Sequence, residues 1–223
     1  MIPHQNLKGV FFVDRGKIRA IATKALVPES VYGELLVKEK GETFRIWDPT
    51  KSKLGAAIVK GISQIGIKPG SKVLYLGCST GTTVSHVSDL VGSEGFVYGI
   101  DFAPRVMRDF IFMAQKRQNI LPILADAKKP ETYQQYVGEI DVVFQDVAQK
   151  NQVGIFLENC NAFLKQGGFG LLAVKARSVD VTKRPDVVFK EVKQVLEKSV
   201  IIVDYRTLDP FERDHALFVV KKK

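Results

Sequence analysis

Apolar runs and amphipathic segments alternate along most of this chain, and they predict alternating strands and helices. From residue 51 onward, strands are expected at residues 72–77, 95–100, 120–125, 140–145 and 168–174. Helices are expected between them at residues 53–65, 82–90, 104–116, in a segment that ends near 164, and at 185–198. This alternation predicts an α/β fold with a parallel, doubly wound sheet.

The last two predicted strands, at residues 200–205 and 216–220, have no helix between them. Only residues 206–215 connect them, so we expect an antiparallel hairpin at the edge or in the middle of the sheet. Seven strands with a reversed terminal hairpin are the layout of Rossmann-like methyltransferases. The Lys221–Lys223 end is expected to be a frayed, solvated terminus.

The first 50 residues follow a different pattern. Short strand-like runs occur at residues 10–13, 18–22, 34–37 and 44–47, and Asp14–Lys17 has the composition of a hairpin turn. We therefore expect two domains. Residues 1–50 would form a small antiparallel β domain, and residues 51–223 would form the Rossmann-like domain.

Composition narrows the class of protein. Hydrophobic residues make up 45% of the 223 residues and charged residues 26%, which is typical of a soluble globular chain. No apolar run approaches the roughly 18 residues of a membrane helix, and the N-terminus lacks the apolar core of a signal peptide. The two cysteines, Cys78 and Cys160, do not have metal-ligand spacing, so we expect no metal site. These features predict a cytoplasmic protein, and the net charge of +9 indicates a polyanionic partner such as nucleic acid.

Candidate chemistry gathers where the predicted parallel strands end, the edge at which such sheets bind ligands. The loop Gly77–Thr83 follows the first of these strands, and Asp101, Asp126 and Asp146 follow the next three. Carboxylates at these positions suit the ribose hydroxyls and the adenine amino group of an adenosine ligand. The predicted cofactor contacts are Gly77, Gly81, Thr82, Thr83, Asp101, Phe102, Asp126, Ala127, Asp146, Val147, Ala148 and Gln149.

The loop, Asp101 and Asp126 also have a purely structural interpretation. The loop is a tight turn, Asp101 caps a helix before Pro104, and Asp126 forms an Asx-turn. The loop matches neither a Walker motif nor G-x-G-x-x-G, and it carries no Lys or Arg to meet a pyrophosphate. An acidic pocket of this kind favours S-adenosylmethionine over NAD.

Several segments resemble fibrillarin, the methyltransferase of box C/D ribonucleoproteins, and the resemblance covers nearly the whole chain. They are residues 45–54, 68–77, 81–89, 146–149 and 212–216. The chain lacks the Gly/Arg-rich extension of eukaryotic members, so it resembles the archaeal form; a eukaryotic source would place it in the nucleolus. It departs from the family with Cys78-Ser79-Thr80 in place of Ala-Ala-Ser, and with Asp101 in place of Glu.

The resemblance implies guide-directed 2′-O-methylation of ribose in rRNA, and possibly tRNA, with S-adenosylmethionine as donor. It further implies a box C/D guide RNA, a target RNA, a Nop-domain scaffold protein and a kink-turn-binding protein of ribosomal type as partners. Sequence would then be read by base pairing, which agrees with the absence of a recognisable RNA-binding motif.

Related ribose methyltransferases use a Lys-Asp-Lys set with a fourth polar residue. The matching positions are Lys53, Asp146, Lys175 and His215. Lys175 would accept the hydroxyl proton, Asp146 would orient Lys175, and Lys53 would steer the hydroxyl or bind the adjacent phosphate. The alternatives are a surface lysine at 53 and a structural histidine at 215. Further along, Arg177, Lys183 and Arg184 suit RNA phosphates, unless they form only a solvated loop.

Three other functions remain open on sequence grounds. Fibrillarin-type proteins of eukaryotes also methylate a histone glutamine, so a protein methyltransferase is one alternative. A structural subunit of an RNA particle is the second, although the intact Lys53, Asp146 and Lys175 set argues against it. An NAD-dependent oxidoreductase is the third, and the missing glycines count against it.

Overall fold

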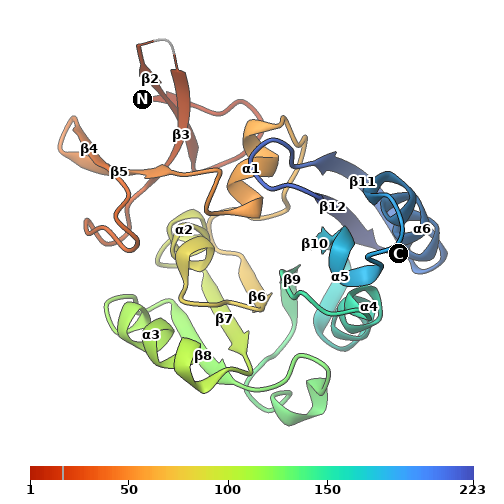
Figure 1. Ribbon diagram of the computed structural model, residues 1–223. Helices are drawn as coiled ribbons and strands as arrows, with labels where there is room; N and C mark the ends of the chain where they lie inside the picture. Colours follow the sequence, from red (N-terminus) through yellow and green to blue (C-terminus); the bar gives the residue numbers. More distant parts are fainter. Residues whose placement is uncertain (17) are drawn as a thin grey trace.

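The computed structural model describes residues 1–16 and 18–223 (Figure 1). The N-terminal part forms an antiparallel sheet in the order β1-β2-β3-β5-β4. The predicted turn at 14–17 includes Lys17, which lies outside the described residues, but the strands on either side of it pair as expected. The strands are β1 (Ile2–Pro3), β2 (Val10–Arg15), β3 (Ile18–Lys24), β4 (Leu36–Glu39) and β5 (Glu42–Trp47).

The described residues after Trp47 form a seven-stranded sheet in the order β11-β12-β10-β9-β6-β7-β8. Neighbouring strands from β10 to β8 are parallel, while β12 runs antiparallel between β10 and the edge strand β11. The predicted Rossmann-like fold with a reversed hairpin is therefore confirmed. The strands are β6 (Lys72–Leu76), β7 (Phe96–Asp101), β8 (Ile120–Leu124), β9 (Ile140–Gln145), β10 (Leu164–Lys175), β11 (Val200–Thr207) and β12 (His215–Lys222).

Helices cover both faces of this sheet, because successive side chains of its buried strands point to opposite faces. In β9, Val142 and Phe144 join an apolar cluster with α1, α2 and α3, whereas Val143 joins a second cluster with α4 and α6. No helix of the described residues is long and apolar enough to cross a membrane. The helices are α1 (Lys53–Val59), α2 (Thr82–Val91), α3 (Pro104–Ala114), the 3₁₀ turn η1 (Pro130–Thr132), α4 (Gln152–Phe163), α5 (Ala176–Val179) and α6 (Pro185–Ser199).

Several predicted bounds differ from the structure, and the differences at α1 and at the C-terminus have a clear physical reason. Helix α1 ends at Val59 rather than near residue 65, because Gly61 follows with a φ of +78°, a left-handed conformation that terminates helices. At the C-terminus, Lys222 belongs to β12 and its Nζ donates to three carbonyls at the end of α4. The expectation of a frayed end was therefore wrong.

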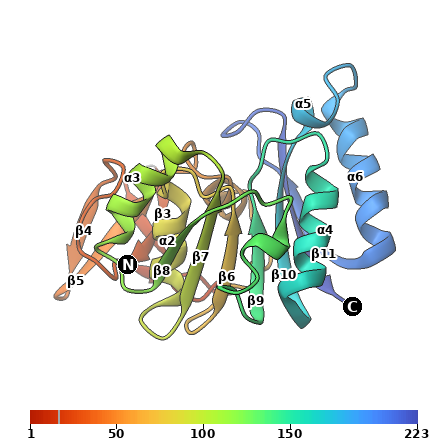
Figure 2. The same ribbon diagram turned by 90° about the horizontal axis from the view of Figure 1, so that it is seen from below.

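The N-terminal sheet lies at the opposite end of the molecule from α6, beside α1 and α2 (Figures 1 and 2). Leu7, Val10, Ile21 and Trp47 share one apolar cluster with residues of α1, α2 and the large sheet. The domain boundary near residue 50 stays an interpretation of the sequence, since the two sheets meet through a continuous core.

A buried polar network also joins the two parts. The Arg45 guanidinium pairs with Glu34 at 2.6 Å and with Asp89 of α2 at 2.8 Å, and Arg117 pairs with the same Asp89 at 2.8 Å. Beside them, the His86 ring stacks on Trp47 with a centroid distance of 4.5 Å.

Candidate functional site

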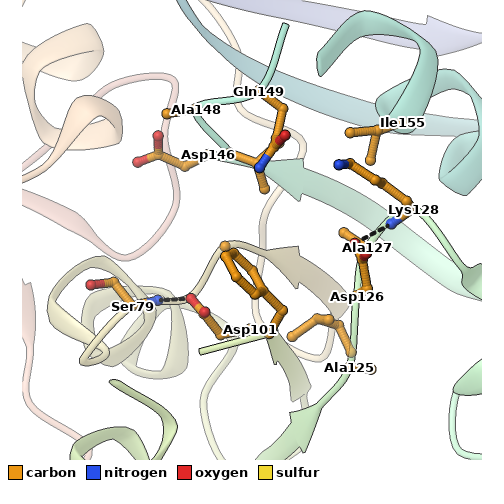
Figure 3. Close-up of a pocket in the computed structure, with 14 residues that line it drawn as sticks. Ser79, Asp101, Ala125, Asp126, Ala127, Lys128, Asp146, Ala148, Gln149 and Ile155 are labelled. Atoms are coloured by element: carbon orange, nitrogen blue, oxygen red, sulfur yellow. Dashed lines mark hydrogen bonds between the residues drawn. The ribbon is translucent and has the colours of Figure 1, made fainter. Parts of the chain in front are cut away.

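A cleft of about 350 Å³ opens at the carboxyl ends of β6, β7, β8 and β9 (Figure 3). Its size is ordinary for a small-molecule site. In Figure 3, Asp146, Ala148 and Gln149 lie across the cleft from Asp101 and Asp126. The lining residues are Gly77, Ser79, Ile100, Asp101, Phe102, Ala125, Asp126, Ala127, Lys128, Asp146, Val147, Ala148, Gln149 and Ile155.

Gly77 begins the loop after β6 and is the position at which this loop requires a glycine. Its φ is +80°, and an added Cβ would lie 2.4 Å from the carbonyl oxygen of Asp146. The Gly77 and Cys78 amides both donate to the Ile100 carbonyl, at 2.9 and 3.1 Å. The loop is therefore held against both neighbouring strands while its backbone faces the cleft.

The Asp101 carboxylate sits at the floor of the cleft and braces the loop. One oxygen accepts the Ser79 amide and the other accepts the Ala103 amide, each at 3.0 Å. The expected helix cap at Asp101 was wrong, because Ala103 is the N-cap of α3 (Pro104–Ala114) and Asp101 lies two residues before it, where it bonds the Ala103 amide in a turn. Since an ionised carboxylate has about four acceptor positions, capacity remains for the hydroxyls of a ligand.

Asp126 follows β8 and forms an Asx-turn, as its structural interpretation predicted. Its Oδ1 accepts the Lys128 amide at 3.0 Å. The same residue also lines the cleft beside Ala127, so the turn and a ligand contact are compatible.

Three of the predicted cofactor residues, Gly81, Thr82 and Thr83, do not line this cleft. Gly81 packs under α3, where an added Cβ would lie 2.4 Å from Met113 Cε. Thr82 lines a separate pocket between α3 and residues 27–32. The Thr83 hydroxyl is buried and donates to Ser52 Oγ at 3.0 Å. The residues at the start of α2 thus contact other parts of the protein than the ligand site.

Lys53 and Asp146 form an ion pair at one end of the cleft, with Nζ and Oδ2 3.0 Å apart. About a fifth of each side chain is exposed. Lys53 is the first residue of α1, whose N-cap Ser52 accepts the Gly55 amide at 3.2 Å. Ser52 also accepts the Thr83 hydroxyl, so the start of α1 is anchored to α2 and the lysine is held beside the strand ends.

Lys175 and His215 lie opposite each other where β10 and β12 pair. Within residues 1–16 and 18–223, Lys175 Nζ has no hydrogen-bond or ion-pair partner, and the side chain is exposed. Asp146 therefore holds Lys53, and not Lys175 as the sequence argument had expected. His215 is buried, and its Nδ1 lies 2.6 Å from the Arg213 carbonyl, so Nδ1 carries the proton and Nε2 is left as an acceptor. Burial, reinforced by the charge of Lys53, lowers the pKa of His215, although the bond to the Arg213 carbonyl and the charges of Glu212 and Asp146 oppose the shift.

The three basic residues predicted to bind RNA follow β10 in the chain, Arg177 in α5 and the other two just before α6. Each has an exposed ion pair: Arg177 with Asp214 at 3.0 Å, Lys183 with Glu191 at 2.7 Å, and Arg184 with Asp186 at 3.1 Å. Exposed pairs of this kind contribute little to stability, so these side chains can exchange their partners for phosphates at small cost.

Comparison with known proteins places this geometry in a family. The fibrillarin family model matches residues 1–223. The chain belongs to the fibrillarin family. It is 52% identical to the fibrillarin-like rRNA/tRNA 2′-O-methyltransferase of Thermococcus onnurineus over 99% of each chain. It is 54% identical to the Pyrococcus furiosus protein of the same name, over 96% of this chain and 95% of that one.

Solved fibrillarin structures share the fold over nearly the whole chain. The Methanococcus jannaschii fibrillarin pre-rRNA processing protein superposes with a TM-score of 0.94 at 47% identity, covering 98% of this chain and 96% of that one. Aeropyrum pernix fibrillarin, solved with natively bound S-adenosyl-L-methionine, gives 0.91 at 44% identity with the same coverage. A fibrillarin/Nop5p complex gives 0.87 at 37% identity, covering 97% of this chain and 99% of that one. The family expected from the sequence is confirmed.

Five residues that line the cleft were missed by the sequence argument: Ser79, Ile100, Ala125, Lys128 and Ile155. Ser79 has a φ of +50°, a backbone conformation that its residue type does not predict. Lys128 directly follows Asp126 and Ala127, which were predicted to contact the cofactor, so its position in the sequence could have identified it. Ile155 comes from the first turns of α4, and a helical apolar residue gives no sign that it faces a ligand site.

Proposed function

We propose that this chain transfers a methyl group from S-adenosylmethionine to the ribose 2′-hydroxyl of rRNA and tRNA. It would act as the catalytic subunit of a box C/D particle, with a guide RNA, a Nop-domain scaffold protein and a kink-turn-binding protein. The observation that carries the proposal is the Lys53–Asp146 pair at the end of the cleft, in a chain half identical to relatives named for this reaction.

The residues of the cleft fit S-adenosylmethionine. Asp101 and Asp126 offer carboxylate acceptors for ribose hydroxyls and an adenine amino group, and Ile100 and Val147 offer apolar walls. Gly77 leaves room for close approach to the loop backbone. When bound, this cofactor supplies a methyl group already activated on a sulfonium. The residues of the chain therefore have to align the attacking oxygen and manage its proton.

We assign these two tasks to different lysines. Lys53 is held by Asp146, so it is fixed enough to orient the ribose hydroxyl or the adjacent phosphate. Lys175 has no partner among the residues that the structure describes, and it takes the hydroxyl proton. Its amine is exposed in the free chain, so this role requires RNA or partner proteins to cover it, because loss of water favours the neutral amine. His215 Nε2 is a second acceptor beside Lys175.

RNA would be held at its backbone rather than read. Arg177, Lys183 and Arg184 are charged and exposed, and they lie in the segment that follows β10, which suits phosphate contacts. A guide RNA would then select the nucleotide by base pairing. This division explains how a chain without a base-reading module can still methylate one defined ribose.

The test is methyl transfer from labelled S-adenosylmethionine in a particle assembled from the chain, the two partner proteins, a box C/D guide and its target RNA. Alkali cannot cleave next to a 2′-O-methyl group, so the expected product is label in an alkali-resistant dinucleotide that disappears when the guide is omitted. Label in protein would favour a protein methyltransferase. An assembled, cofactor-binding particle that transfers no label would favour a structural subunit.

A further inference from the structure

A buried glutamine connects the cofactor side of the cleft to the end of β10. Gln152 is the first residue of α4, and its side chain is fully buried. Its Nε2 donates to the Gln149 carbonyl at 3.0 Å, and its Oε1 accepts the Lys175 amide at 3.3 Å. The same Nε2 lies 3.5 Å from the Lys175 carbonyl. One side chain thus contacts both backbone groups of Lys175 and the backbone of a cleft residue.

Gln152 is itself fixed from the sheet. Gln145, the last residue of β9, is fully buried and its Nε2 donates to the Gln152 carbonyl at 2.6 Å. Asp146 follows Gln145 directly in the chain. The two glutamines therefore link the end of β9 through the start of α4 to the end of β10.

An amide at this buried position is costly unless its bonds are made, and an apolar side chain would pack there without that cost. The contacts of Gln152 are with two segments that carry the proposed chemistry. Gln149 lines the cleft, and Lys175 is the lysine to which we assign the hydroxyl proton.

We propose that Gln152 is a positioning residue for methyl transfer, which fixes the backbone of Lys175 relative to the cofactor-side loop. This inference rests on the proposed function. Transfer requires the attacking oxygen, the methyl group and the sulfur to be in line, and a displacement of about 1 Å can cost roughly 100-fold in rate. A clamp on the Lys175 backbone therefore acts on the rate of the chemical step and leaves RNA affinity alone.

The decisive variant is Gln152→Met, which keeps the length of the side chain and removes its hydrogen bonds. Its control is Asn119→Leu. Asn119 is a buried amide whose Nδ2 donates to the Ser88 and Gly92 carbonyls, at 3.0 and 2.9 Å, and it does not line the cleft. In the assembled particle, we expect Gln152→Met to lower the single-turnover methylation rate constant roughly 10- to 100-fold, with the KM for target RNA within about twofold. Asn119→Leu should keep the wild-type rate constant at a temperature where both variants are folded.

A second readout does not depend on activity. Amide hydrogen exchange should speed up in the peptides that contain residues 146–151 and 175–177 of Gln152→Met, and it should stay unchanged there in Asn119→Leu. If Gln152→Met does not fold, the same two measurements are made on Gln145→Met, for which we expect a smaller decrease in the rate constant. A rate constant and exchange pattern equal to those of the control would overturn the inference. If wild type itself methylates no RNA, the proposed function fails, while the exchange data still decide whether Gln152 holds the two segments.

Discussion

At the scale of single residues, the proposed division of labour between the two lysines makes Lys175 the more sensitive position. Lys175→Ala removes a side chain that has no partner in the described part of the chain and that lies outside the residues lining the cleft. We expect turnover in the assembled particle to fall at least ~100-fold, the usual contribution of a positioned proton acceptor. The affinity for S-adenosylmethionine, measured by calorimetry, should stay within a factor of about two. Turnover that survives the substitution would move the proton acceptor elsewhere, with His215 as the next candidate.

Asp101→Ala should have the opposite profile. It removes the acceptor for the Ser79 and Ala103 amides and one of the carboxylates that line the cleft. We expect calorimetry to show cofactor affinity falling at least tenfold, the equivalent of about 1.4 kcal/mol for one lost charged hydrogen bond. Unchanged affinity would show that Asp101 serves only to brace the loop and the turn that leads into α3.

His86 gives the fold a predictable response to acid. The Thr23 hydroxyl donates to Asp89, so it accepts from His86 Nδ1, and the Tyr32 hydroxyl then donates to Nε2 at 2.7 Å. Both ring nitrogens are committed in the neutral form. Burial, with smaller contributions from Arg45 and Arg117, lowers the pKa of His86 well below its usual 6.5.

Because the unfolded chain binds a proton near pH 6.5 and folded His86 does not, the contribution of His86 to stability is complete above that pH. It decreases as the pH falls from 6.5 toward the folded pKa. Urea unfolding at pH 7.5 and 5.5 should show wild type losing about 1.4 kcal/mol from this group. His86→Phe should be less stable at pH 7.5 but lose less between the two pH values. Equal losses in both proteins would mean that folded His86 protonates as readily as in the unfolded chain.

At the scale of elements, the last strand stabilises a helix from another part of the chain. Lys222 Nζ donates to the carbonyls of Cys160, Asn161 and Leu164 at the C-terminal end of α4, where helix carbonyls need partners from outside the helix. We expect Lys222→Met to lower the free energy of unfolding by about 1–2 kcal/mol in urea. Lys221→Met, at an exposed neighbour whose amine lies 6.0 Å from the Phe169 ring, should change it by less than about 0.5 kcal/mol. Similar losses for the two variants would show that Lys222 acts through general charge rather than through these carbonyls.

This contact also shows what sequence patterns could and could not give. Periodicity located the strands of the large sheet and their alternation with helices, because each buried run is short and bounded by turn residues. It also located Asp101, Asp126 and Asp146 at one edge, because parallel strands end together. It could not show that Lys222 reaches α4, or that Thr83 turns toward Ser52, because both depend on contacts between segments distant in sequence.

At the scale of the whole molecule, the two sheets should unfold together. Trp47 is the only tryptophan of the chain and lies fully buried at the junction between them. It stacks on His86 of α2, and an added Cβ at Gly55 of α1 would lie 2.9 Å from its Nε1. Its fluorescence therefore reports on the junction, while far-UV circular dichroism reports on all helices and strands. We expect the two urea transitions of wild type to coincide, as in a cooperative unit.

A substitution of Arg45 tests more directly whether the two sheets unfold together. Arg45→Met leaves the buried carboxylates of Glu34 and Asp89 without their shared partner, which should cost roughly 3–5 kcal/mol. The apolar contacts of Leu7, Val10, Ile21 and Trp47 with the helices remain, so both transitions should move to lower urea by the same amount. If the fluorescence transition alone moves, the N-terminal sheet detaches as a separate unit, and the ion network rather than the core holds it to the methyltransferase fold. In that case residues 1–50 are a domain in the thermodynamic sense, and the division near residue 50 describes folding as well as topology.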